Sequence, residues 1–131
     1  MPRTRAIGWL FASLALLGGC QTQLAQEFPL ARFKAETTLD RGIRQYDDGD
    51  YRLAARTIQG ALDAGLTTRS QARAHKYLAF IHCTSSQTSA CRNEFRLALL
   101  ADPRTELKAE EAGHPIWGPV FRSVKAGKVN P

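Results

Sequence analysis

The sequence lacks the residue patterns that usually mark a catalytic centre. It contains no paired carboxylates, no nucleophile beside a base and no glycine loop of the kind that binds phosphate. Its histidines are few and scattered, at His75, His82 and His114. Asp47, Asp48 and Asp50 are close together but lack the spacing of an EF-hand calcium loop. We therefore expect a protein that is not an enzyme and that needs no cofactor, metal or small-molecule substrate.

The sequence also lacks a hydrophobic run long enough to cross a membrane. The longest run, Ile7–Leu17, is interrupted by Gly8 and Ser13, whereas a bilayer core needs about 20 apolar residues. Its length is typical of the apolar region of a signal peptide, and Arg3 and Arg5 supply the positive charge that precedes such a region. We therefore expect residues 1–19 to be a cleaved signal peptide.

The residues Leu17-Gly18-Gly19-Cys20 resemble the lipoprotein box of bacterial lipoproteins. In that family the cysteine is acylated and becomes the new N-terminus, so the resemblance implies lipidation of Cys20. The acyl chains would hold the protein on a membrane, because each buried methylene contributes about 0.8 kcal/mol. Gln21 follows instead of the aspartate that usually marks inner-membrane retention, which implies the periplasmic leaflet of the outer membrane. The alternative is an ordinary signal peptide that happens to contain a cysteine.

Cysteine is scarce in the rest of the chain, where only Cys83 and Cys91 remain. The residues between them, TSSQTSA, are small, polar and typical of a turn between two helices. In an oxidising compartment a pair across such a turn can meet the distance limits of a disulfide, so we expect Cys83 and Cys91 to form one. The alternatives are two free buried thiols or a metal pair, and the histidines at His75 and His82 are too far apart on a helix to complete a zinc site.

The chain carries a net charge of +6. Removal of the signal peptide removes the basic residues Arg3 and Arg5 and no acidic residue. A basic surface in a cytosolic protein would suggest nucleic acid, but the expected compartment argues against that partner. The excess charge indicates either a solvated basic surface or attraction to an anionic headgroup, glycan or acidic protein.

The remaining length is sufficient for one helical domain. Residues 20–29 are expected to be the lipidated N-terminus and a tether, because the segment QTQLAQEFP shows no clear period. Pro29 is typical of a helix start. We therefore expect a helical domain over residues 30–126, with a helix that stops near Gly49 and a flexible tail over residues 127–131.

A spacing of apolar residues occurs twice, 37 positions apart. Ala54, Ile58, Ala61 and Leu62 are followed at that shift by Cys91, Phe95, Ala98 and Leu99. The same shift carries Gly42 onto Ala79 and Tyr46 onto Cys83, where small or medium residues allow two antiparallel helices to approach closely. The pattern predicts an all-α protein built from two helix-turn-helix units.

These residues resemble the tetratricopeptide repeat. The segment GIRQYDDGDYRLAARTIQGAL matches its pattern at Gly42, Tyr46 and Gly49-Asp50-Tyr51, and YLAFIHC…CRNEFRLALLADP gives a second copy. The second copy departs in the turn, where Ser86-Gln87-Thr88 stands in place of Gly-Asp-Tyr. We infer that the disulfide replaces the usual turn packing there.

Two such repeats are fewer than the three that are usually needed for stability. We expect the C-terminal segment to cover the second repeat. Gly113 ends a short helical turn, Pro115 can start the next helix, and Trp117, Phe121 and Val124 then form one apolar stripe. This stripe indicates a capping helix, and the alternative is that Trp117 and Phe121 form a partner site.

The resemblance to tetratricopeptide repeats implies a peptide-binding groove along the first helix of each repeat. Residues on those helices that face away from the second helices are the candidates: Ile43, Asp47, Arg73, Lys76 and Phe80. Arg73 and Lys76 suit a carboxylate, and Phe80 offers apolar area. The alternative is that Ile43 and Phe80 pack on the C-terminal helix while the charges face solvent.

The ending AGHPIWGPVFRSVK, the lipoprotein box, the two cysteines and the helix HKYLAFIHC together resemble small proteobacterial lipoproteins with tetratricopeptide-like repeats. Some of these accompany type VI secretion gene clusters. The resemblance implies a scaffold that binds a protein or peptide of an envelope assembly. The alternative is a structural envelope module that binds peptidoglycan or, like a pilotin, helps to insert another outer-membrane complex.

Overall fold

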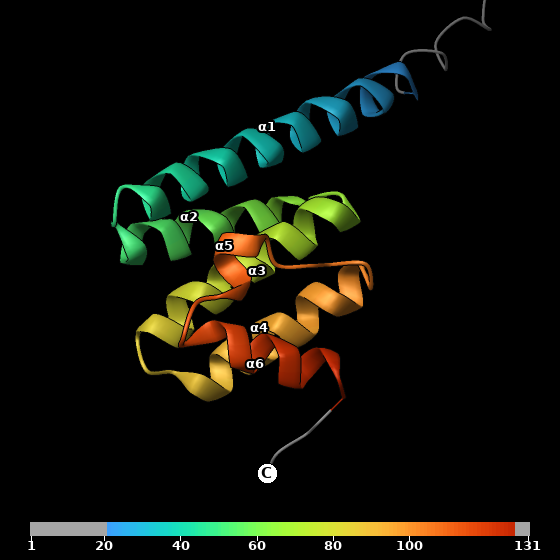
Figure 1. Cartoon of the computed structure of the whole chain (residues 1–131). Helices are drawn as coiled ribbons and strands as arrows, with labels where there is room; N and C mark the ends of the chain where they lie inside the picture. Colours follow the sequence, from blue (N-terminus) through green and yellow to red (C-terminus); the bar gives the residue numbers. More distant parts are fainter. Residues whose placement is uncertain (1–20, 128–131) are drawn as a thin grey trace, which may run out of the picture.

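The structure, a computed structural model, describes residues 21–127 (Figure 1). The predicted all-α fold is confirmed for this part of the chain, which contains helices and turns and no strand. The helices are α1 (Gln21–Asp47), α2 (Tyr51–Ala64), α3 (Thr68–Thr84), α4 (Thr88–Ala101), α5 (Ala109–Ala112) and α6 (Trp117–Lys125). The predicted signal peptide, the lipidation site Cys20 and most of the predicted tail lie outside the described residues.

The helices α1 to α4 form two antiparallel hairpins, α1 with α2 and α3 with α4. Their boundaries at the turn repeat at the same shift as the apolar pattern, although α1 is longer than α3 at its start. The first helices end at Asp47 and Thr84, and the second helices begin at Tyr51 and Thr88. A helix of 14 residues follows the turn in both hairpins. The two hairpins are therefore the same local structure built twice.

The two hairpin turns also share their backbone hydrogen bonds. The N–H of Asp48 donates to the carbonyl of Arg44 at 2.9 Å, and that of Ser85 donates to Ile81 at 3.1 Å. The next residue is left-handed in both turns, with φ of 86° at Gly49 and 61° at Ser86. Glycine adopts this conformation without steric cost, whereas serine carries a Cβ that opposes it. The second turn therefore keeps the geometry of the first with a less suitable residue.

The predicted inward faces of the second helices are confirmed, except that Leu62 and Leu99 are only partly buried. Buried side chains lie on α2 at Ala54, Ile58 and Ala61, and on α4 at Cys91, Phe95 and Ala98. The approach of α1 to α2 is so close that a Cβ on Gly42 would lie 2.6 Å from Cγ1 of Ile58. A larger residue at position 42 would therefore force the first hairpin apart.

Helix α3 contributes to both hydrophobic cores, which makes the two hairpins one unit. In the first core Leu39 and Ile43 of α1 and Ile58 of α2 pack with Ala74 and Leu78 of α3. In the second core the C-terminal half of α3, from Ala79 to Cys83, packs with α4 and α6. Because α3 contributes to both cores, neither hairpin buries its apolar face alone.

The sulfur atoms of Cys83 and Cys91 are at disulfide distance, and their Cα atoms are 5.1 Å apart. The pair links the end of α3 to the first turn of α4 and lies in the second core. The equivalent residues of the first hairpin are Tyr46 and Ala54, and there the ring of Tyr46 packs on that of Tyr51 at 5.3 Å between centroids. An aromatic pair thus occupies the first turn where the cysteine pair occupies the second.

The start of the first helix differs from the prediction. The helix α1 begins at Gln21, and Pro29 lies inside it instead of at its first turn. A proline inside a helix removes one backbone hydrogen bond and crowds the preceding turn. The helix nevertheless continues through it. A helix rises about 1.5 Å per residue, so the segment between Cys20 and Pro29 reaches less than half as far as an extended tether would.

The C-terminal segment covers the second hairpin, as predicted. The helix α6 packs against α4 and α3, and its N-terminal boundary is Trp117, two residues after Pro115. A Cβ on Gly118 would lie 2.5 Å from the carbonyl oxygen of Ala112. This close approach brings α5 and α6 together at a sharp corner.

The repeated turn generates a prediction about Gly49 and Ser86. A left-handed residue with a Cβ costs about 1–2 kcal/mol. We expect Gly49→Ala to lower the free energy of unfolding by about 1 kcal/mol. Ser86→Gly should raise it by less, because glycine also adds freedom to the unfolded chain. Urea unfolding monitored by circular dichroism measures both changes.

The matched control is Gly60→Ala, the same substitution inside α2, where a Cβ would meet nothing within 4 Å. There alanine should stabilise by about 0.5–1 kcal/mol because of its higher helix propensity. If Gly49→Ala stabilised the protein as Gly60→Ala does, the left-handed assignment of the turn would be contradicted.

Candidate functional site

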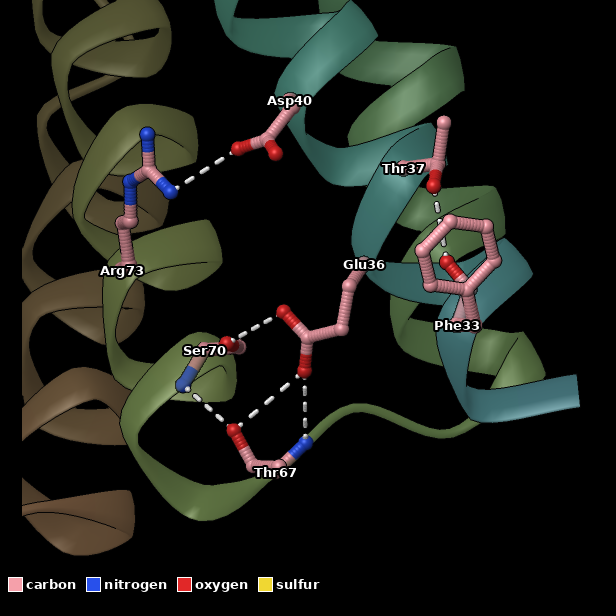
Figure 2. A network of polar contacts seen from close by, with 7 residues as sticks. All are labelled: Phe33, Glu36, Thr37, Asp40, Thr67, Ser70 and Arg73. Carbon is pink, nitrogen blue, oxygen red and sulfur yellow. Dashed lines mark hydrogen bonds and ion pairs between the residues drawn. The ribbon is translucent and has the colours of Figure 1, made fainter. Parts of the chain in front are cut away.

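The helices α1 and α3 meet along a strip of polar side chains (Figure 2). The Oε1 atom of Glu36 accepts hydrogen bonds from the backbone N–H and the hydroxyl of Thr67, both at 3.3 Å. Its Oε2 atom accepts one from the hydroxyl of Ser70 at 2.6 Å. Thr67 is the N-cap of α3 and accepts from the N–H of Ser70. A carboxylate is favourable at a helix N-terminus, so Glu36 fixes the start of α3 against α1.

One turn further along, Asp40 and Arg73 bridge the same two helices. The Oδ1 atom of Asp40 lies 3.0 Å from Nη1 of Arg73, and the two side chains are 50% and 48% exposed. An exposed pair of this kind contributes only about 0–1 kcal/mol to stability. Solvent reaches both groups, so this contact can break at little cost to the fold.

The structure divides the predicted groove residues into two sets. Asp47 and Arg73 are exposed on α1 and α3, and a partner-binding role for them stays a prediction. Ile43 lies in the first core, Phe80 lies in the second, and Lys76 is buried although it is charged. These three side chains therefore do not line an open groove.

Lys76 differs from both alternatives that the sequence suggested. Its ammonium group donates to the two carboxylate oxygens of Glu111 at 2.9 and 2.8 Å. It also lies 5.5 Å from the ring centre of Tyr77 and 5.7 Å from that of Phe80. The prediction that Lys76 binds a partner's carboxylate is therefore wrong, because the carboxylate at its ammonium group belongs to the chain itself.

Glu111 connects this ion pair to the C-terminal cover. Its carboxylate also accepts the N–H of Lys108 at 2.9 Å, at the start of α5. Its backbone carbonyl accepts the indole N–H of Trp117 at 2.9 Å. The indole stacks on Phe80, with ring centres 4.5 Å apart. One acidic residue thus holds α5, α6 and α3 together.

Trp117 and Phe121 are both buried by the chain itself. Of the two alternatives, a capping helix or a partner site, they therefore take the arrangement of a capping helix. Phe121 packs edge-on against Phe95 of α4, with ring centres 5.2 Å apart. His114 stacks on the indole of Trp117. In this arrangement Trp117 and Phe121 offer little surface to a partner.

Three tyrosines gather where the two hairpins meet. The ring of Tyr46 lies 5.3 Å from Tyr51 and 5.1 Å from Tyr77. Burial, followed by the nearby Tyr51, Tyr77 and carboxylates, raises the pKa of Tyr46 to about 12. Burial and the charge of Glu111 also raise the pKa of Tyr77. Both hydroxyls therefore stay neutral at physiological pH.

A second surface feature is an open hollow of about 340 Å³ beside α6. Its charged residues are already engaged: Lys125 pairs with Glu106, and Arg122 donates to the carbonyl of Ala112 at 3.2 Å. Small-molecule sites usually offer a few convergent polar groups that are free to bind. This hollow is therefore a weaker candidate for a binding site than the strip between α1 and α3.

The sequence analysis missed the three acidic residues that organise this region: Glu36, Asp40 and Glu111. The spacing of Glu36 and Asp40, one helical turn apart, could have placed them on one face of α1. Glu111 gave no such indication, because its partner Lys76 lies 35 positions away.

Within residues 21–127 no group of three histidine, cysteine or acidic side chains could hold a metal ion. In the same residues, none of the helices has the length and apolar character needed to cross a membrane. In comparisons with known proteins, the chain matches no family model, no curated protein sequence and no solved structure.

Proposed function

We propose that this chain is a non-enzymatic lipoprotein, anchored to the periplasmic leaflet of the outer membrane, that acts as a scaffold for protein–protein interaction. The observation that carries the proposal is the repeated helical hairpin, in which the end of the first helix, both ends of the second helix and most turn hydrogen bonds recur at one shift. The inward face recurs in the same way. Repeated hairpins stack to create extended surfaces that bind other proteins.

We further propose that the two hairpins are tetratricopeptide-like. Their short turns, the glycine at the close approach of α1 to α2 and the small residues at Ala54 and Ala61 support this proposal. The C-terminal helix takes the role of the capping element that such arrays need. In this arrangement α1 and α3 are the first helices of the repeats, and the strip between them is the working surface.

The available groups on this strip define the kind of partner that it suits. Asp40 and Arg73 are half-exposed, and Asp47 is exposed near the three tyrosines. A protein segment with both charges could pair with Asp40 and Arg73 while its backbone meets the tyrosine hydroxyls. We propose that the segment belongs to an envelope assembly.

Among such assemblies we propose a type VI secretion system, of which this chain would be an accessory component. The support is the resemblance of the lipoprotein box, the cysteine pair and the C-terminal segment to lipoproteins that accompany those gene clusters. A pilotin-like or peptidoglycan-binding envelope module is the alternative. Co-purification with the secretion membrane complex would support the first, whereas binding to purified sacculi or loss of secretin multimers on deletion would support the second.

The anchoring part of the proposal predicts the behaviour of Cys20→Ala. Without acylation the chain should be lost from the outer-membrane fraction, because the acyl chains supply nearly all of the proposed membrane affinity. Fractionation of cells that express the wild type or the variant measures this loss. A variant that remained in the outer membrane at the wild-type level would rule out the lipoprotein proposal.

The scaffold part predicts the effect of exchanging the charges of Asp40 and Arg73. The double substitution Asp40→Arg with Arg73→Asp keeps an ion pair but reverses its direction across the strip. We expect the free energy of unfolding to change by less than about 0.5 kcal/mol, as for other surface substitutions. Capture of the secretion membrane complex by the purified protein should nevertheless fall.

The matched control exchanges the pair Lys125 and Glu106, which are 37% and 69% exposed and join α6 to the loop after α4, away from the strip. That variant should keep both its stability and its capture of the complex. Unchanged capture by the Asp40–Arg73 exchange, with normal stability, would remove the strip from the binding site.

A further inference from the structure

The helix α1 has three distinct faces. Its buried face contains Ala35, Leu39 and Ile43. A second face carries the acidic residues Glu36 and Asp40, which contact α3. Figure 2 shows these two side chains directed at α3, whereas Phe33 and Thr37 lie on the other side of the helix.

The third face points to solvent, and we call its residues the α1 outer stripe: Leu30, Phe33, Lys34, Arg41 and Arg44. With about 100° of rotation per residue, these positions fall within about one third of the helix circumference. All of them are exposed, and Leu30 and Phe33 are 60% and 69% exposed although they are large and apolar.

The charges of the outer stripe have one sign. Lys34, Arg41 and Arg44 form no ion pair with any other described residue, and the acidic side chains of α1 that make cross-helix contacts are turned to α3. Exposed apolar residues beside unpaired basic residues are the composition of a helix that lies on an anionic membrane surface. The charge pattern matches phosphate headgroups, and the two apolar side chains match the boundary of the acyl chains.

The position of α1 in the chain points to the same partner. The helix begins at Gln21, directly after the cysteine that we propose to be acylated. It extends beyond α2 at this end (Figure 1). An anchor at residue 20 would therefore place Leu30 about three helical turns from the headgroups and Arg44 no more than about seven.

We infer that the α1 outer stripe docks on a phospholipid surface that contains anionic headgroups. This inference rests on the proposed membrane anchoring and adds an orientation to it. With α1 lying on the membrane, the buried face of the helix and the second hairpin are turned to the periplasm. The strip between α1 and α3 then stands at the side of the molecule, where a membrane-bound partner can reach it.

The test uses the mature chain, residues 20–131, with Cys20→Ala and Phe33→Cys. Position 33 is then the one reactive thiol once Cys83 and Cys91 are joined. A fluorescent probe at position 33 is mixed with phosphatidylcholine vesicles that contain or lack phosphatidylglycerol. Vesicle flotation reports attachment, and a lipid-borne quencher reports whether the probe touches the bilayer. We expect strong quenching only when phosphatidylglycerol is present.

Lys34→Glu with Arg41→Glu should weaken this contact on the order of tenfold or more, because each basic residue adds affinity for an anionic surface. The matched control, Arg69→Glu with Arg96→Glu, reverses the same number of exposed charges on α3 and α4 and should leave the quenching unchanged. Circular dichroism verifies that all the variants are folded.

Three outcomes would overturn the docking. The probe could stay unquenched on vesicles that contain phosphatidylglycerol, whether or not the chain floats with them. The control could lose quenching as fully as the stripe variant, which would show a response to net charge alone. The probe could be shielded equally without lipid, which would identify another protein chain as the occupant. Because Cys20 is absent from this experiment, these outcomes leave the acylation of the native chain to the fractionation test.

Discussion

The second hairpin depends on a buried ion pair, in which a residue of the C-terminal segment binds a residue of α3. Lys76 lies on α3 with 10% of its side chain exposed, and Glu111 supplies both of the oxygens that bind its ammonium group. A buried cation without a partner is strongly destabilising, and breaking such a pair costs about 3–5 kcal/mol. The segment that carries Glu111 must therefore be in place for α3 to bury Lys76.

Several features follow from this requirement. Once Glu111 is docked, its carbonyl accepts the indole N–H of Trp117, and the ring stacks on Phe80. The corner at Gly118 then directs α6 along α4, where Phe121 meets Phe95. Two hairpins alone would leave this apolar surface open. The chain thus occupies with its own C-terminal segment the surface that a third hairpin would cover.

The sequence predicted the helical part of this fold well for a physical reason. The buried positions of α2 and α4 repeat at helical spacing, and Ala54, Ile58 and Ala61 or their counterparts fill them with apolar residues. Such a pattern depends on neighbours in the chain and can be read locally. The cover by Trp117 and Phe121 was predictable in the same way, because their spacing forms one apolar stripe.

The parts that could not be predicted depend on residues far apart in the sequence. Lys76 was assigned to solvent or to a groove because no nearby residue explains the burial of a charge, and its partner lies 35 positions away. Ser86 gave no indication of its left-handed conformation, which became visible only beside Gly49 of the first turn. Pro29 predicted a helix start, but the continuation of α1 on its N-terminal side overrode that local preference.

The most direct test of this account is a double-mutant cycle on Lys76 and Glu111. Lys76→Met, Glu111→Gln and the double variant are compared with the wild type by urea unfolding, and glutamine keeps an acceptor for the N–H of Lys108. If the pair completes the second hairpin, each single change should cost several times more than an exposed ion pair, and the coupling energy should exceed about 1.5 kcal/mol. A coupling energy below about 0.5 kcal/mol, as for exposed ion pairs, would contradict the claim that the C-terminal segment is held on α3 by this contact.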